Sequence, residues 1–269
     1  MLAGGAEWWL AYLVLGGIVG FFAGLLGIGG GLIIVPVLVF LFDAQQFPRE
    51  HVLHLALGTA MTTIVFTSLS SVRAHHYRKA VRWDVVKAMT PGILVGTLSG
   101  AAVAGSLPRQ PLAVVFTLFV YYASAQMWLN VKPKPSRQLP GWWGLLGAGA
   151  GIGAISSLVA GGGAFLTVPG LTWCNVDMRQ AVGTAAAAGI PIALAGAVGY
   201  ILVGLGKGPL PEHSLGFVYL PALAWVVLSS MMTASLGARA AHYLPVGVLK
   251  KIFSVFMFLL ATRMLMTLF

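Results

Sequence analysis

The stretch Gly24-Leu-Leu-Gly-Ile-Gly-Gly-Gly-Leu-Ile-Ile-Val-Pro36 places four glycines within five residues inside an otherwise apolar run. The run covers roughly residues 8–42, which is too long for one helical crossing of a bilayer and short for two. Glycines there interrupt a helix, and unwound backbone inside a membrane is tolerated only where protein or a wet cavity surrounds it. The stretch therefore predicts a broken helix in the protein interior.

The rest of the chain is also apolar. Of its 269 residues, 58% are hydrophobic and 8% are charged, whereas soluble domains carry about 25% charged residues. Six further apolar runs each approach the ~20 residues that cross a bilayer. They cover roughly residues 52–72, 84–105, 110–131, 179–203, 214–237 and 246–268. The composition predicts an all-α integral membrane protein.

The same landmarks recur in the second part of the chain. Gly-Gly-Gly-Leu-Ile-Ile-Val-Pro at residues 29–36 matches Gly-Gly-Gly-Ala-Phe-Leu-Thr-Val-Pro at residues 161–169, within a second broken stretch at about 142–173. Two Gly-Thr pairs, Gly58-Thr59 and Gly183-Thr184, follow in the same order. Prolines complete the series, with Pro91 matching Pro221 and Pro108 matching Pro245. We therefore predict two homologous halves, residues 1–131 and 142–269, joined by a linker at 132–141.

Two topologies fit the broken stretches. In one, each stretch is a re-entrant hairpin that returns to the side it entered from; in the other, it continues onward and the chain crosses eight times. With hairpins, 12 of the 16 Lys and Arg residues fall on one side of the membrane, and with eight crossings the division is 10 to 6. The positive-inside rule favours hairpins. Each half then crosses an odd number of times, which predicts inverted repeats with both termini outside.

Charge and cysteine content exclude several classes of protein. The net charge of +10 comes from cations in the short connections between apolar runs, which is typical of a membrane protein and not of a nucleic-acid-binding protein. The single cysteine, Cys174, excludes an internal disulfide. All six acids lie at predicted helix ends or in loops, so a carboxylate relay in the membrane is not expected. No motif for a metal or another cofactor is present.

Main-chain groups at the two breaks form the predicted binding site. The N-terminus of a helix carries about +0.5 of an elementary charge, and two such ends that converge suit a small oxyanion. Hydroxyl and basic side chains nearby are further candidates. The predicted substrate-binding residues are Gly29, Gly30, Gly31, Gly161, Gly162, Gly163, Thr59, Thr62, Thr184, Arg179 and His54.

Several of these residues have a structural alternative. The threonines are also suited to hydrogen bonds with their own helices. Asp177 and Arg179 are typical of a helix cap and an interface anchor. Two series of glycines at four-residue spacing predict close helix packing and not a site. These are Gly16, Gly20 and Gly24, and Gly92, Gly96 and Gly100.

The glycine stretch at residues 24–36, the segment Leu57-Gly-Thr-Ala60 and their counterparts in the second half resemble the sulfite exporter TauE/SafE family of membrane permeases. The resemblance extends from about Gly17 to Leu268. The second break, Val159-Ala-Gly-Gly-Gly163, departs from the pattern because it lacks the leading Gly-Ile of the first. The resemblance implies a bacterial or archaeal inner-membrane transporter of a sulfur-containing anion such as sulfite or an organosulfonate.

We therefore expect a secondary transporter that works by alternating access around a site near the middle of the membrane. Its expected partners are a small anionic solute and membrane lipids, without nucleic acid, and a homo-oligomer is left open. The alternatives are an anion channel and a non-transporting membrane subunit. An enzyme is not expected, because Ser156, Ser157 and His54 do not form a known catalytic motif.

Overall fold

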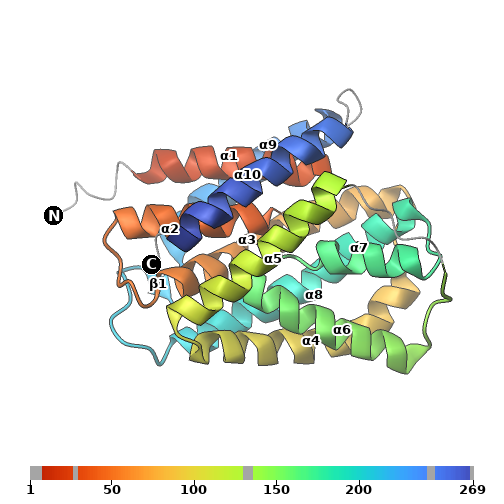
Figure 1. Cartoon of the computed structure of the whole chain (residues 1–269), viewed down its shortest axis with the longest axis horizontal. Helices are drawn as coiled ribbons and strands as arrows, with labels where there is room; N and C mark the ends of the chain where they lie inside the picture. The colour runs from red at the N-terminus through yellow and green to blue at the C-terminus, as the bar shows by residue number, and fades with distance from the viewer. Residues whose placement is uncertain (1–7, 27–29, 130–135, 241–245, 267–269) are drawn as a thin grey trace.

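The computed structural model describes residues 8–26, 30–129, 136–240 and 246–266 (Figure 1). Within them the first half forms α1 (Trp8–Leu26), α2 (Gly31–Ala44), α3 (Val52–Tyr77), α4 (Trp83–Ser106) and α5 (Arg109–Leu129). The second half forms α6 (Trp142–Val159), α7 (Ala164–Trp173), α8 (Met178–Gly204), α9 (Leu220–Ala240) and α10 (Val246–Met266). A short sheet of β1 (Ser214–Leu215) and β2 (Val218–Tyr219) lies between α8 and α9. The predicted all-α fold is confirmed.

Five described helices are long and apolar enough to cross a membrane, namely α3, α4, α5, α6 and α8. Shorter apolar helical segments occur in α1, α2, α7 and α9. Helix α10 has 21 residues and carries Lys250, Lys251 and Arg263. Of the six full crossings expected from the sequence, four thus meet the length and hydropathy that a crossing requires. The crossings by α9 and α10 stay predictions.

Both broken stretches are hairpins. At the open end of the first hairpin, the Gln45 side chain just after α2 donates a hydrogen bond to the Tyr12 hydroxyl in α1. At the open end of the second, the backbone N–H groups of Ser136 and Arg137 both donate to the Trp173 carbonyl oxygen at 3.2 Å. Figure 1 shows the two hairpins opening toward opposite ends of the molecule. This course agrees with the hairpin topology and not with the eight-crossing alternative.

The segment before α9 differs from the prediction. A helix was expected from about residue 214, but residues 214–219 form an antiparallel hairpin with Leu215 opposite Val218. Gly216 occupies the left-handed region, with φ of 54°. A Cβ atom there would lie 2.2 Å from the Ile201 carbonyl oxygen of α8. The turn therefore packs directly on the α8 backbone, and α9 starts only at Leu220.

The two halves interleave. Helix α1 packs along α9 of the other half, and α6 packs along α4. Each of the six glycines at four-residue spacing faces the backbone of the partner helix, where a Cβ atom would lie 2.0–2.6 Å from a carbonyl oxygen. The predicted role of these glycines in close helix packing is confirmed.

Equivalent helices of the two halves run antiparallel where they meet. Along the α3–α8 contact, Met61 lies against Gly196 and Ser68 against Gly189. Along the α5–α10 contact, the Tyr121 hydroxyl bonds the Thr262 hydroxyl at 2.8 Å, while Lys251 lies over the Trp128 ring. This is the arrangement expected of inverted repeats. The repeat boundaries and their orientation in a bilayer stay predictions.

The orientation has a direct test. Arg263 near the end of α10 lies over Phe40 near the end of α2, and Trp9 at the start of α1 lies beside Trp225 at the start of α9. A reporter fused after Phe269 should therefore give an extracytoplasmic signal, because the positive-inside rule places most cations at the opposite end. Alkaline phosphatase and green fluorescent protein fusions measure this. A fluorescent green fluorescent protein fusion together with an inactive alkaline phosphatase fusion would contradict the predicted orientation.

Candidate functional site

The two breaks meet each other at mid-depth. A Cβ atom on Gly31, the first residue of α2, would lie 2.0 Å from the carbonyl oxygen of Ala160 in the second break and 2.7 Å from Ile64 Cδ1. On the other side, a Cβ atom on Gly189 would lie 3.2 Å from the Gly162 carbonyl oxygen. Ile64 is near the middle of the 26 residues of α3, and Gly189 near the middle of the 27 residues of α8. The breaks therefore converge between the centres of the two long inner helices.

Each break ends in a left-handed glycine that starts the next helix. Gly30 has φ of 76° and Gly163 has φ of 76°, and neither helix that follows receives a side-chain cap. Because the first N–H groups of a helix have no partner within it, these two ends present uncapped donors and the positive end of a dipole. Such ends suit an anion.

The structure changes the correspondence between the two glycine triplets. The sequence pairs residues 29–31 with residues 161–163, but the shared backbone conformation pairs Gly30 with Gly163, so that Gly31 corresponds to Ala164. Pro36 and Pro169 are then both the sixth residue of their helices. The left-handed glycine is the second of its triplet in the first half and the third in the second half, while the proline follows six residues after it in both. Gly29 lies outside the described residues.

Two hydroxyl groups near the breaks were not predicted as site residues. Thr167 Oγ1 lies 3.6 Å from where a Cβ atom of Gly163 would be, is buried, and has no hydrogen-bond partner among the described residues. Ser68 Oγ lies 3.3 Å from the corresponding position of Gly189. Thr167 could have been predicted from the sequence, because it is a polar residue within the apolar segment that follows the second glycine triplet.

Each Gly-Thr pair contacts the backbone of the other half of the chain. Thr59 Oγ1 accepts the backbone N–H of Tyr219 at 3.0 Å, and Thr184 Oγ1 accepts that of Arg82 at 3.0 Å. These N–H groups belong to the residues just before α9 and α4. We call the two equivalent arrangements, Gly58-Thr59 on residues 217–219 and Gly183-Thr184 on residues 80–82, the clasps.

Close approach at the clasps explains the glycines. A Cβ atom on Gly58 would lie 2.2 Å from the Phe217 carbonyl oxygen, and one on Gly183 would lie 2.3 Å from that of Ala80. Thr62 donates to the Gly58 carbonyl oxygen of its own helix at 2.9 Å. The threonines therefore have structural partners, and contact of Thr59, Thr62 or Thr184 with a solute stays a prediction.

His54 and Arg179 lie away from the breaks. Each is ten residues before the mid-depth contact on its helix, which is about 15 Å at 1.5 Å per residue. Asp177 caps α8 by accepting the Arg179 backbone N–H at 3.0 Å, while the Arg179 guanidinium donates to the Arg78 carbonyl oxygen at 3.2 Å. The alternative of a helix cap is confirmed for Asp177. The structure thus does not place His54 or Arg179 beside the converging glycines.

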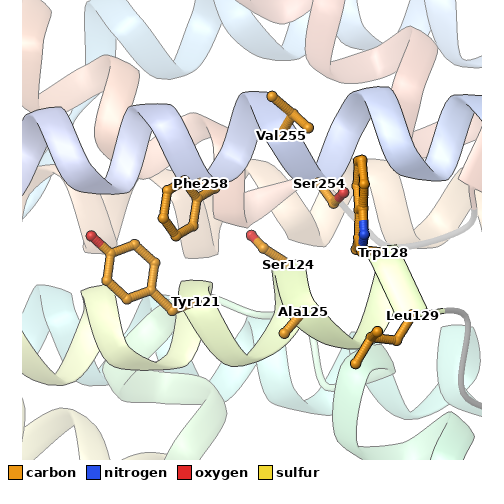
Figure 2. A pocket seen from close by; sticks show the side chains of 8 residues that line it. All are labelled: Tyr121, Ser124, Ala125, Trp128, Leu129, Ser254, Val255 and Phe258. Carbon is orange, nitrogen blue, oxygen red and sulfur yellow. The ribbon is translucent and has the colours of Figure 1, made fainter.

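A cavity of about 560 Å³ on the outer face, between α5 and α10, is unsuited to an anion (Figure 2). Its walls are the largely apolar side chains shown in Figure 2, of which Trp128, Leu129 and Phe258 are among the more exposed. Within the described part of the chain, no three His, Cys, Asp or Glu residues gather in a way that could hold a metal ion. The converging breaks remain the arrangement best suited to a polar solute.

A family model described as sulfite exporter TauE/SafE matches residues 12–264. The chain belongs to this family. A TauE/SafE relative from Haemophilus influenzae, named "Probable membrane transporter protein", is 36% identical over 257 residues, covering 95% of this chain and 97% of the relative. Relatives with similar names occur in Bacillus subtilis, at 26% identity with 87% and 90% covered, and in Methanocaldococcus jannaschii, at 24% identity with 84% of each covered. No solved structure matches the chain.

Membership of the TauE/SafE family confirms the resemblance seen in the glycine landmarks. It also confirms the broad prediction of a multi-pass membrane transporter and not an enzyme. The family does not specify the solute or the residues that contact it. Both are inferred below from the geometry of the two breaks.

Proposed function

We propose that the protein is a secondary transporter of a small sulfur-containing anion, such as sulfite or an organosulfonate, in the inner membrane of its cell. The solute binds between the two breaks, and alternating access exposes this site to each side in turn. The observation that carries the proposal is the contact of Gly31 with the Ala160 carbonyl at the centre of α3 and α8. It brings the uncapped start of α2 and the second break together at mid-depth.

The polarity of the interior supports an anion over a cation. The described acids lie near helix ends or in connections, where Asp43 pairs with Arg109 and Asp84 with Arg82. A metal cation or an ammonium group would need carboxylates or carbonyl oxygens directed at it. The starts of α2 and α7 offer N–H donors without a side-chain cap, and Thr167 adds a hydroxyl without a partner among the described residues, although the Ala160 and Gly162 carbonyl oxygens also lie at the breaks.

The family description supports a sulfur oxyanion among anions of similar size. Sulfite and sulfonate groups are compact and bear several acceptor oxygens, so backbone N–H groups at helix starts match them in sign. Because glycine has no side chain, the oxygens approach the main chain directly.

Binding to the purified protein tests the substrate class. We expect sulfite, an organosulfonate or thiosulfate to raise the melting temperature by several degrees at millimolar concentration, because a ligand that binds only the folded state stabilises it by mass action. Sulfate and small carboxylates at equal ionic strength are the comparison. Stabilisation by carboxylates alone would contradict the proposed substrate class.

Flux through proteoliposomes separates the remaining alternatives. A carrier should show saturable uptake and counterflow, whereas a channel should show neither. A purified chain that binds but moves no anion by itself would support the non-transporting subunit.

A further inference from the structure

A second cavity, of about 490 Å³, lies at one end of the molecule. It is formed by the α2–α3, α4–α5 and α8–α9 connections together with the first turn of α3. Its charged and histidine side chains are Arg49, Glu50, His51, His54, Arg109 and Lys207. Figure 1 shows this end, where α2 connects to α3 and where β1 lies. We call it the basic cavity.

The basic cavity has an excess of positive charge. Three cations and a single carboxylate, Glu50, line it. Asp43 bonds Arg109 Nη2 at 2.9 Å from outside the lining, so three cations against Glu50 and Asp43 leave a net charge of +1, which Arg49 and Lys207 supply. These two side chains are exposed and come from different connections. The topology with hairpins assigns four cations to this side of the membrane, and three of them are gathered here.

One buried donor in the lining, Arg109 Nε–H, has no hydrogen-bond partner among the described residues. Arg109 donates through Nη1 to the Arg49 carbonyl and through Nη2 to Asp43, while its Nε–H makes no hydrogen bond among the described residues. His54 is 3% exposed, and its Nε2 lies 3.0 Å from the Ala104 carbonyl oxygen. This geometry makes Nε2 a donor, so the Nδ1 of a neutral His54 is an acceptor and offers no hydrogen bond to an anion. An unpaired buried donor is costly, so the Arg109 Nε–H suits the cavity to an occupant that accepts hydrogen bonds.

The basic cavity and the candidate site lie along the same helix, α3. Phe217 stacks on His54 with ring centroids 5.0 Å apart, and the Phe217 carbonyl touches Gly58 of a clasp. From His54 the α3 helix continues ten residues to Ile64, which contacts Gly31 at the breaks. That is about 15 Å, or half the ~30 Å thickness of a bilayer core. The basic cavity therefore lies at the mouth and the breaks at mid-depth.

We propose that the basic cavity is an anion-binding vestibule, in which an organosulfonate or another oxyanion binds on its way to or from the breaks. This inference rests on the proposed function for its role in transport, although the binding itself does not require transport. A positively charged concave mouth raises the local concentration of anions and speeds their arrival, and salt weakens this effect.

A thiol probe measures the anion preference of the basic cavity directly. Gln110 lines the cavity and is exposed, so Gln110→Cys in a Cys174→Ser background places a single thiol there. Methanethiosulfonate reagents that carry a sulfonate or a trimethylammonium group then report the two signs of charge. We expect Arg49→Gln with Lys207→Gln to lower the sulfonate-to-ammonium ratio of labelling rates about tenfold at low salt. Inorganic sulfate should slow the sulfonate reagent more than the ammonium reagent at fixed ionic strength.

The matched control removes the same charge elsewhere. Arg73→Gln with Lys87→Gln neutralises two exposed cations outside the basic cavity and should leave the ratio unchanged. If the double variant does not fold, Lys207→Gln alone should still lower the ratio by a smaller factor. An unchanged ratio, or sulfate that slows both reagents equally, overturns the vestibule. Normal labelling in a protein that moves no anion would count against the proposed transport and leave the vestibule standing.

Discussion

Replacing Gly31 by alanine should reduce anion transport at least tenfold while the protein still inserts into the membrane. The added Cβ atom would lie 2.0 Å from the Ala160 carbonyl oxygen, so the two breaks must separate by about an ångström to admit it. If this displacement raises the barrier to turnover by about 1.4 kcal/mol, the rate falls tenfold. Initial uptake rates in proteoliposomes, normalised to folded protein from gel filtration, give the measurement.

Gly151→Ala is the matched control for Gly31→Ala. Gly151 lies in α6 of the second half, and a Cβ atom there would meet no atom of the described residues within 4 Å. Its uptake rate should equal that of the unsubstituted protein. Full activity of Gly31→Ala would show that the breaks tolerate separation, and the candidate site would then have to lie elsewhere.

Gly58→Ala and Gly183→Ala should each destabilise the protein by about 1–3 kcal/mol, the usual range for overpacking a closely packed position. Both glycines are inside helices, where alanine normally stabilises by about 1 kcal/mol relative to glycine. The sign of the effect is therefore informative, because only the approach of the Phe217 and Ala80 carbonyl oxygens makes alanine unfavourable. Thermal unfolding in detergent, followed by fluorescence-detected gel filtration, gives the order of stability.

Because the two clasps are equivalent, the stability experiment has a second expected result. The two variants should lose similar stability, since the Cβ positions lie 2.2 and 2.3 Å from the facing oxygens. Gly147→Ala, on an open face of α6, should be neutral or stabilising. A loss confined to one clasp, or a gain in both, would contradict the contacts described for the Gly-Thr pairs.

The sequence predicted the helices and the breaks well, because both depend on local composition. Predicted spans at 52–72, 84–105 and 179–203 correspond to α3, α4 and α8 within a few residues. Glycine clusters mark the breaks because no side chain favours the left-handed turns at Gly30 and Gly163. The spacing of glycines along α1 and α4 likewise predicted close packing, although not the identity of the partner helices.

Contacts between distant segments could not be predicted. Nothing near Thr59 in the chain indicates that its hydroxyl accepts the N–H of Tyr219, 160 residues away. The basic cavity was missed for the same reason, since Arg49, Arg109 and Lys207 come from three separate connections. His54 was selected for its position beside the first Gly-Thr pair, but the length of α3 separates it from the breaks by about 15 Å. The Thr59 hydrogen bond, the basic cavity and the position of His54 all depend on chain topology, which local sequence patterns do not specify.

The interleaving of the halves determines which parts of the protein are able to move as rigid bodies. Along α1 with α9 and α4 with α6, glycines rest against main-chain carbonyls, and a rearrangement of side chains cannot relieve a shift there. Between α3 and α8 the neighbours are side chains, Met61 and Ser68, which adjust by changing rotamer. During transport, the two parts of the protein are therefore expected to slide past each other at the contact between α3 and α8. Each moving block then combines helices from both repeats, so neither repeat expressed as a separate polypeptide would retain a complete block.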